Sequence, residues 1–148
     1  MYVRQVDLTR GVDPDFAKQL RQLSTKETHE TGTLLFHRGD EATFAYLLLM
    51  GKVRLTLGET GHVVHVVSRP GTTFGWSSLA GREAYSATAE CVEPTTVLKL
   101  DRGDFEGLAA KDPKNAMIYY KRLAEVLSAR LIESYERYEK LYKGETRL

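Results

Sequence analysis

Short apolar segments separated by glycine-containing turns fill residues 27–100 and constrain the fold more than any other feature. Residues 53–57 alternate apolar and polar side chains, the pattern of a strand with one buried face. Further strands are expected at residues 31–36, 44–50, 62–67 and 97–100 and around Cys91, with a hairpin connection at residues 59–61. Many short strands with regular turn glycines indicate a jelly roll or a nearly closed β-sandwich.

Helices are expected on both sides of this β region. Asp13-Pro14 combines a capping residue with proline at the first helical position, which predicts a helix at about residues 13–24. A short helix is expected at residues 101–110, and Asp112-Pro113 ends it. A long helix then covers about residues 114–143, where glycine and proline are absent. The expected fold class is mainly β with flanking helices.

One stretch, FGWSSLAGREAYSATA at residues 74–89, resembles a ligand-binding segment. Gly75 suits a turn, and residues 76–79 suit a first helical turn whose backbone N–H groups lack partners and could bind an anion. Ser86 to Ala89 then reads as an extended return.

The same stretch resembles the phosphate-binding cassette of the cyclic-nucleotide-binding domain family, found in catabolite-activator (Crp/Fnr-type) regulators and in gated channels and kinases. The positions in register are Gly75, Leu79, Ser86, Ala87, Thr88 and Ala89. Glycines from Gly32 to Gly75 also follow the family's barrel pattern. The resemblance implies one β-roll domain over the whole chain 1–148, with helix and roll at about 13–112 and the long helix at about 114–143.

Two positions depart from that family pattern. Trp76 stands where the family has the glutamate that binds the ribose hydroxyl, and Tyr85 stands where it has the arginine that neutralises the phosphate. Since a charge-assisted hydrogen bond contributes ~1.5–3 kcal/mol, this loss argues against cyclic AMP bound in the family's usual way. Nucleotide binding through the backbone of residues 75–78 alone stays a third possibility.

The long helix carries an apolar seam with a 3.5-residue repeat, the period of coiled coils. Its members are Tyr120, Ala124, Leu127, Leu131, Ser134, Tyr138 and Leu141. Leu123 and Val126 widen the stripe, so the first turns are expected to touch the roll as well. The seam predicts a parallel homodimer. The opposite face of the helix is expected to be solvent-exposed. It carries three favourable i,i+4 pairs: Glu133–Arg137, Glu136–Lys140 and Glu139–Lys143.

Composition excludes several classes of function. The net charge of +1 gives no general attraction to nucleic acid or membranes, and the apolar runs are too short to cross a bilayer. In regulators of the family the long helix leads into a DNA-binding domain, whereas this sequence ends at Leu148, so no DNA-binding domain and no direct DNA binding are expected. One cysteine, Cys91, cannot form an intrachain disulfide. A cytoplasmic location is expected.

An enzymatic role finds little support in the sequence. His62 and His65 are three residues apart, so a flat strand places them on opposite faces, and they are interpreted as exposed residues and not metal ligands. Ser77 and Ser78 have no neighbouring base, which leaves no catalytic residue to name. A metal-dependent, cupin-like enzyme is therefore disfavoured, and no metal or certain cofactor is expected.

The preferred interpretation is an effector domain that senses a small molecule through the cassette, with Trp76 stacking on the ligand and Tyr85 offering its hydroxyl. The alternative is a dimeric adaptor whose two rings block the pocket and which binds a partner protein. The candidate pocket residues are Phe74, Gly75, Trp76, Ser77, Ser78, Tyr85, Ser86, Ala87 and, from the long helix, Ser134.

Overall fold

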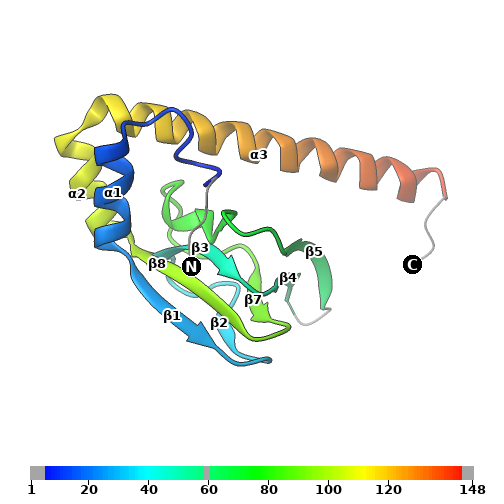
Figure 1. Cartoon of the computed structure of the whole chain (residues 1–148). Coiled ribbons are helices and arrows are strands. Elements are labelled where there is room, and N and C mark those ends of the chain that lie inside the picture. The colour runs from blue at the N-terminus through cyan, green and yellow to red at the C-terminus, as the bar shows by residue number, and fades with distance from the viewer. Residues whose placement is uncertain (1–5, 59–60, 145–148) are drawn as a thin grey trace.

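A β-roll with three helices forms the molecule, as the computed structural model of residues 6–58 and 61–144 shows (Figure 1). In chain order the elements are α1 (Pro14–Leu23), β1 (Thr25–His29), β2 (Leu34–Phe36), β3 (Phe44–Met50), β4 (Val53–Leu57), β5 (His62–Val67), β6 (Thr73–Phe74), the 3₁₀ turn η1 (Trp76–Ser78), β7 (Thr88–Cys91), β8 (Thr95–Asp101), α2 (Arg102–Lys111) and α3 (Pro113–Tyr142). Residues 59 and 60 of the expected hairpin connection lie outside the described ranges.

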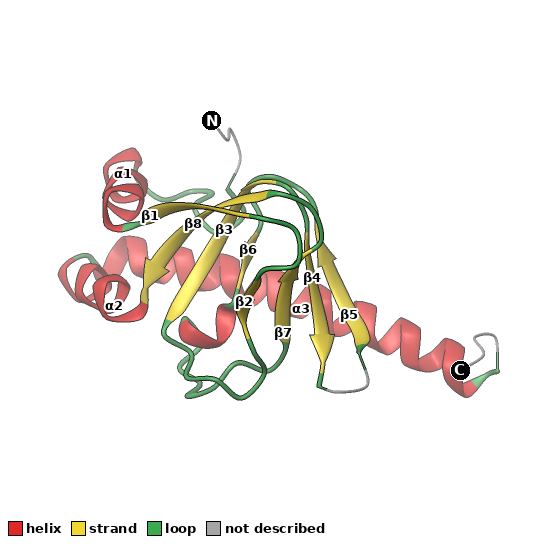
Figure 2. Ribbon diagram, turned by 90° about the horizontal axis from the view of Figure 1, so that it is seen from below, coloured by secondary structure: helices red, strands yellow, loops and turns green. Residues whose placement is uncertain are grey.

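Two four-stranded antiparallel sheets face each other. The first has the order β1-β8-β3-β6 and the second β2-β7-β4-β5 (Figure 2). The expected strands at residues 44–50, 53–57 and 62–67 are confirmed, because their alternating or continuous apolar pattern is strong. Strand β1 was not expected from the sequence, since its five residues TKETH are polar and it pairs with β8 at the edge of its sheet.

Alternation along β3 separates the core into two clusters. Tyr46 and Leu48 point between the sheets, where they pack with Phe74, Val97 and Cys91. Ala45, on the opposite face of β3, belongs to a second cluster beneath the helices, whose members include Phe16, Leu20, Leu100, Phe105, Leu108, Tyr119 and Leu123. Cys91 is fully buried, as expected for a small apolar residue.

Helices α2 and α3 each start with an aspartate cap. The Asp101 carboxylate accepts from the Asp104 amide at 3.0 Å, and the Asp112 carboxylate accepts from the Asn115 amide at 3.2 Å. At the start of α1 the expectation was wrong in detail. Asp13 occupies the cap position, but its side chain accepts from Asn115 Nδ2 at 3.1 Å and so joins α1 to α3.

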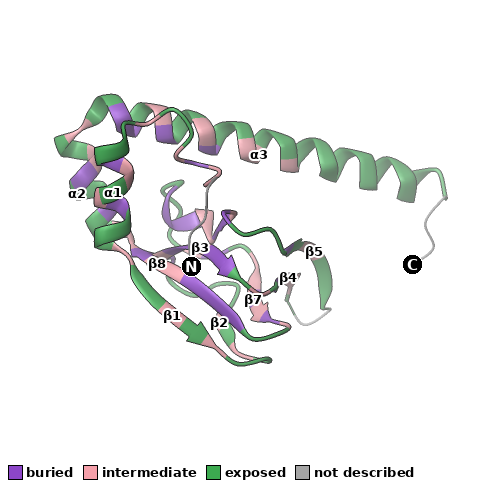
Figure 3. Ribbon diagram, viewed as in Figure 1, coloured by how far each residue is buried: buried purple, intermediate pink, exposed green. Residues whose placement is uncertain are grey.

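The long helix α3 crosses the roll and then extends beyond it (Figure 1). Its first half packs inward through Ala116, Tyr119 and Leu123, with Val126 and Leu127 partly buried, which confirms that the early turns touch the roll. From Leu131 to Gly144 every described residue is exposed (Figure 3). None of the helices in the described ranges is long and apolar enough to span a membrane.

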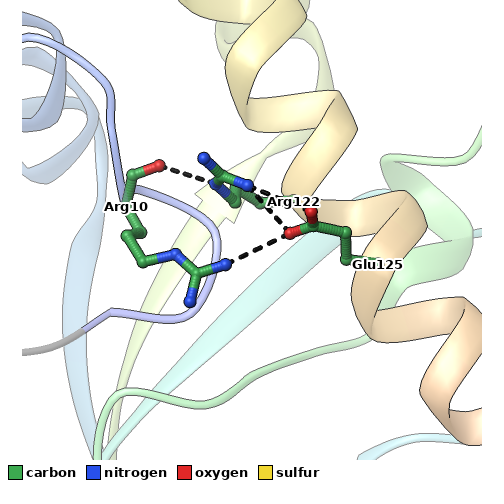
Figure 4. A network of polar contacts seen from close by, with 3 residues as sticks. All are labelled: Arg10, Arg122 and Glu125. Carbon is green, nitrogen blue, oxygen red and sulfur yellow. Dashed lines mark hydrogen bonds and ion pairs between the residues drawn. The ribbon is translucent and has the colours of Figure 1, made fainter.

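A polar network fastens the segment before α1 to the middle of α3 (Figure 4). Arg122 Nε donates to the Arg10 carbonyl oxygen at 2.8 Å, and Arg122 Nη1 donates to the Glu125 carboxylate at 2.9 Å. Arg10 Nη2 contacts the same carboxylate at 3.2 Å. The hydrogen bond from Arg122 holds the pKa of Glu125 below its ordinary value. The network therefore joins the segment before α1 to α3.

Candidate functional site

The segment after β6 turns sharply through Gly75 into η1. Gly75 has φ = +73°, and a Cβ there would lie 3.3 Å from the Phe44 carbonyl oxygen and 3.2 Å from Tyr46 Cδ1. Glycine is therefore required both by the backbone angle and by the close approach of β3. The Trp76 indole N–H donates to the Thr73 carbonyl oxygen at 2.8 Å, which fixes the ring beside the turn.

Tyr85 is part of the core and its hydroxyl is used internally. The hydroxyl donates to the Phe44 carbonyl oxygen at 2.5 Å and accepts from the Phe44 amide at 3.0 Å. Its ring stacks on Phe36 with centroids 3.8 Å apart. Burial raises the pKa of this phenol, so it remains neutral. The expectation that Tyr85 offers its hydroxyl to a ligand is therefore wrong, although its ring still forms part of a wall.

A cavity of about 190 Å³ lies beside this segment. Its walls come from β2, β4, β5, the 75–77 turn, the 85–87 segment and α3. The lining residues are Phe36, Leu55, Val64, His65, Gly75, Trp76, Ser77, Tyr85, Ser86, Ala87, Arg130, Ser134 and Arg137. Seven of the nine candidate pocket residues are thus brought together, including Ser134 from a distant helix.

Phe74 and Ser78, the other two candidates, lie away from the cavity wall. Phe74 is fully buried and stacks on Tyr46 with centroids 5.3 Å apart. The Ser78 hydroxyl donates to the Gly75 carbonyl oxygen at 3.0 Å and so closes the η1 turn. Both residues shape the turn from behind, because strand alternation and the 3₁₀ turn direct their side chains inward.

Helix α3 contributes three side chains to the cavity. The Arg130 guanidinium carbon lies 4.7 Å from the centroid of the Trp76 ring, a cation–π contact. Arg137 Nη1 donates to the Val64 carbonyl oxygen at 2.9 Å, which ties the helix to β5. The Ser134 hydroxyl donates to the Arg130 carbonyl oxygen at 3.1 Å, one turn earlier. Glu133 pairs with Arg130 at 3.9 Å, so the expected Glu133–Arg137 partnership is replaced.

A β-bulge in β5 explains how this strand contributes to the cavity wall. Leu55 pairs with His65 and Thr56 pairs with Val63, so Val64 is an extra residue in the strand. As a result Val64 and His65 both line the cavity, although they are adjacent in sequence. The expectation of an exposed His65 assumed a flat strand and was wrong. His62 is exposed, as expected.

The environment of His65 favours its neutral form. Burial lowers the pKa of His65 below its ordinary value, and the positive charges of Arg130 and Arg137 lower it further, whereas Glu133 acts in the opposite direction. Within residues 6–58 and 61–144, no cluster of three or more His, Cys, Asp or Glu side chains is arranged to hold a metal ion.

Arg130 and Arg137 were missed as site residues in the sequence because charged residues on a long helix are usually solvated. A signal was nevertheless present, since they lie four residues before and three residues after Ser134, which places all three on one helix face. Val64 and His65 carried no such signal, because the bulge depends on pairing with β4.

A second cavity, of about 780 Å³, lies between α1 and the outer face of the first sheet. It contains none of the candidate residues. Most of its wall is apolar, with Leu20, Leu47, Leu49 and Leu98 among its members. The smaller cavity is the better candidate because polar and charged groups from separate elements converge on it.

Comparison with known proteins identifies the family of the roll. The family model described as the cyclic nucleotide-binding domain matches residues 26–112, which contain the roll side of the cavity and, apart from Thr25 of β1, both sheets. The match ends where α3 begins, so the helix wall of the cavity lies outside it.

Two curated proteins and one crystal structure are similar over most of the chain. A protein named as a potassium channel from Rhodopseudomonas palustris is 32% identical over 109 residues, which are 74% of this chain and 26% of that protein. The cyclic AMP receptor protein of Thermus thermophilus is 31% identical over 129 residues, 86% of this chain and 58% of that protein. The chain therefore spans less than two thirds of either protein. The crystal structure of Thermus thermophilus catabolite activator protein superposes with a TM-score of 0.75 at 28% identity, covering 92% of this chain and 63% of that one.

Proposed function

This chain belongs to the cyclic nucleotide-binding domain family, and on that premise we propose that it is a non-enzymatic regulatory module that senses a small ligand. The ligand occupies the 190 Å³ cavity beside the 75–78 turn. Binding changes the way α3 packs on the roll, and the geometry of a homodimer formed through α3 reports that change.

The observation that carries this proposal is the composition of the cavity wall. Trp76, Ser77 and Ala87 belong to the roll, whereas Arg130 and Ser134 belong to α3. A ligand held between these two groups must interact with both. It therefore stabilises arrangements in which the helix lies against the roll, which is a population shift driven by differential affinity.

The exposed half of α3 supports the homodimer. Large apolar side chains stay solvent-exposed there: Leu131, Ile132, Tyr135, Tyr138, Leu141 and Tyr142. Leu131, Tyr138 and Leu141 are members of the seam with the coiled-coil repeat. A contiguous apolar face of this kind on a helix that projects from its domain is typical of an interaction surface.

Two features argue that the ligand differs from cyclic AMP bound in the family's usual way. The resemblance places a glutamate and an arginine at positions 76 and 85, where this chain has Trp and Tyr. The Tyr85 hydroxyl is committed to Phe44, so it does not replace the missing cation. The cavity is also smaller than the ~300–1,000 Å³ of ordinary ligand pockets.

Thermal unfolding with a ligand panel tests the proposal. The panel contains cyclic AMP, cyclic GMP and small aromatic acids with their neutral counterparts. A ligand present at about 100 times its dissociation constant adds about 2.7 kcal/mol to the free energy of unfolding, which raises Tm by several degrees. We expect such a shift, and a Ser77→Phe variant that fills the cavity should abolish it. A protein whose Tm responds to no panel member contradicts ligand sensing by this cavity.

The small cavity also favours a second candidate, a ligand-free adaptor that acts only through a partner protein. In that case Trp76 and Tyr85 serve as filler for the pocket. The panel then leaves Tm unchanged, while dimerisation through α3 persists.

A further inference from the structure

Two arginines of α3 supply positive charge to the cavity. Arg130 and Arg137 lie two helical turns apart on one helix face, and both belong to the lining. The Arg130 side chain is only 20% exposed. Its guanidinium lies over the Trp76 ring. A guanidinium stacked by its face keeps the N–H groups of its edge available to bind a carboxylate or phosphate in bidentate geometry.

The ionised side chains that line the cavity are all cationic. Among the described residues that line it there are two arginines and one histidine but no aspartate or glutamate. Glu133 approaches Arg130 only to 3.9 Å, and its own side chain is 56% exposed. Arg137 donates to a neutral carbonyl group, that of Val64. The carboxylates of Glu133 and Asp7 attract Arg130 and offset the repulsion from Arg137, but neither of these acidic residues lines the cavity. An anion bound in the cavity would pair both guanidinium groups directly.

We propose that the cavity binds a small organic anion, a carboxylate or phosphate ester on a compact aromatic body, and that Arg130 and Arg137 pair its charge. This inference rests on the proposed function and names the ligand class. The charge partner comes from the helix and not from the segment at residue 85, where the tyrosine is committed to Phe44. Phe36, Leu55 and Ala87 provide the apolar wall for the ring.

In this arrangement the contacts of α3 depend directly on the charge of the ligand. Arg130 reaches the anion from its place on Trp76. Arg137 exchanges its hydrogen bond to the Val64 carbonyl oxygen for one to the anion, so its contact with the bulge of β5 is lost. Binding of a neutral ligand of the same shape leaves the contact between Arg137 and Val64 in place.

Trp76 fluorescence gives a direct measurement, because Trp76 is the single tryptophan of the chain. The probes are benzoate and phenyl phosphate, their neutral counterparts benzamide and phenol, and cyclic AMP. We expect at least one anion to change the emission saturably and to bind at least tenfold more tightly than its neutral counterpart. Comparing benzoate with phenyl phosphate decides between a carboxylate and a phosphate.

Substitutions of the two arginines test whether their side chains bind the anion. Arg130→Gln and Arg137→Gln should each weaken the binding of that anion at least tenfold, and Arg130→Lys should recover part of the loss. Lys121→Gln is the matched control, since it removes one charge from an exposed site of the same helix and should keep the affinity. Arg137 is itself exposed, so its replacement is expected to leave the fold intact, and circular dichroism verifies this for every variant.

Some outcomes would overturn the inference alone, and others would overturn the proposed function as well. Equal binding of charged and neutral probes, or anion binding that survives both arginine substitutions, overturns the inference and leaves ligand sensing in place. A protein that responds to none of the probes, the cyclic nucleotide included, overturns the proposed function together with the inference.

Discussion

The hydroxyl of Tyr85 is held from both sides by the backbone of Phe44, donating to its carbonyl oxygen at 2.5 Å and accepting from its amide at 3.0 Å. This pair joins the return segment after η1 to the start of β3. Position 85 therefore has a structural role, so a substitution there changes the core as well as the cavity wall.

Removing this hydroxyl should destabilise the fold. Tyr85→Phe leaves the amide and carbonyl groups of Phe44 without their partner, at an expected cost of ~1–3 kcal/mol in the free energy of unfolding. Urea denaturation measures the effect. Tyr142→Phe removes the hydroxyl of a residue that is 82% exposed and serves as the control, with an expected change within ~0.5 kcal/mol. Equal stability of Tyr85→Phe and the wild type would show that the Phe44 contacts contribute nothing.

Introducing the glutamate and arginine that the resemblance places at positions 76 and 85 should also destabilise the fold, because it removes the Tyr85 hydroxyl. The double variant Trp76→Glu, Tyr85→Arg introduces a cation against Phe36 and breaks the Phe44 contacts. We expect this double variant to have a lower Tm than the wild type. Cyclic AMP should raise its Tm only if the variant still folds. A double variant that gains cyclic AMP binding with an unchanged Tm would contradict the structural role of Tyr85.

The junction of α1 with α3 offers a test of packing. Asn115 is 3% exposed, accepts from the Asp13 amide at 3.0 Å, and donates to the carboxylates of Asp13 at 3.1 Å and Asp112 at 2.9 Å. Asn115→Ala leaves these groups unpaired and should lower the free energy of unfolding by ~1–3 kcal/mol. Lys114→Ala changes the neighbouring exposed position and should have little effect on the same denaturation curve.

The structure shows which seam residues can be substituted to test the homodimer without disturbing the fold. Leu127 belongs to the seam but packs partly against the roll, so its replacement would confuse folding with association. Leu131 and Tyr138 are 52% and 69% exposed. Leu131→Glu with Tyr138→Glu should therefore dissociate the dimer while leaving Tm of the roll nearly unchanged. Sedimentation equilibrium decides the matter, and a wild-type protein that sediments as a monomer at tens of micromolar contradicts the proposal.

His65 predicts a pH dependence of stability. Its pKa is lowered in the folded protein by burial and then by Arg130 and Arg137, with Glu133 opposing, so the unfolded chain binds the proton more tightly. Stability should therefore fall as the pH drops through ~6.5, the ordinary value, toward the lower folded-state pKa. In His65→Gln this part of the fall disappears. Urea midpoints measured from about pH 7.5 to about pH 5.5 would show it, and parallel curves for the two proteins would refute it.

Much of the fold follows from the sequence because it depends on local patterns. Strands β3, β4 and β5 repeat their apolar residues clearly, and Asp101, Asp112 and Pro113 mark the starts of α2 and α3. Strand β1 was not predicted, because a polar edge strand has no apolar pattern of its own and forms only where β8 supplies partners. Residues of the 74–89 stretch, which the resemblance singled out, line the smaller cavity.

The parts of the site that the sequence did not show are set by tertiary contacts. Whether Tyr85 faces a ligand or the core depends on the position of Phe44, which is far away in sequence. Whether Arg137 is solvated or bound depends on a bulge in β5. Pattern analysis assigns charged helical residues to solvent by default, so it overlooked both arginines.

Amide hydrogen exchange of α3 tests the central claim most directly. The experiment compares the free protein with the protein saturated by whichever of cyclic AMP, cyclic GMP, benzoate or phenyl phosphate raises Tm most. If the ligand bridges the roll and the helix, exchange slows both in residues 75–87 and in the part of α3 around Arg130 to Arg137. Protection confined to the roll, with exchange in α3 unchanged, would contradict the account, because the helix would then take no part in ligand sensing.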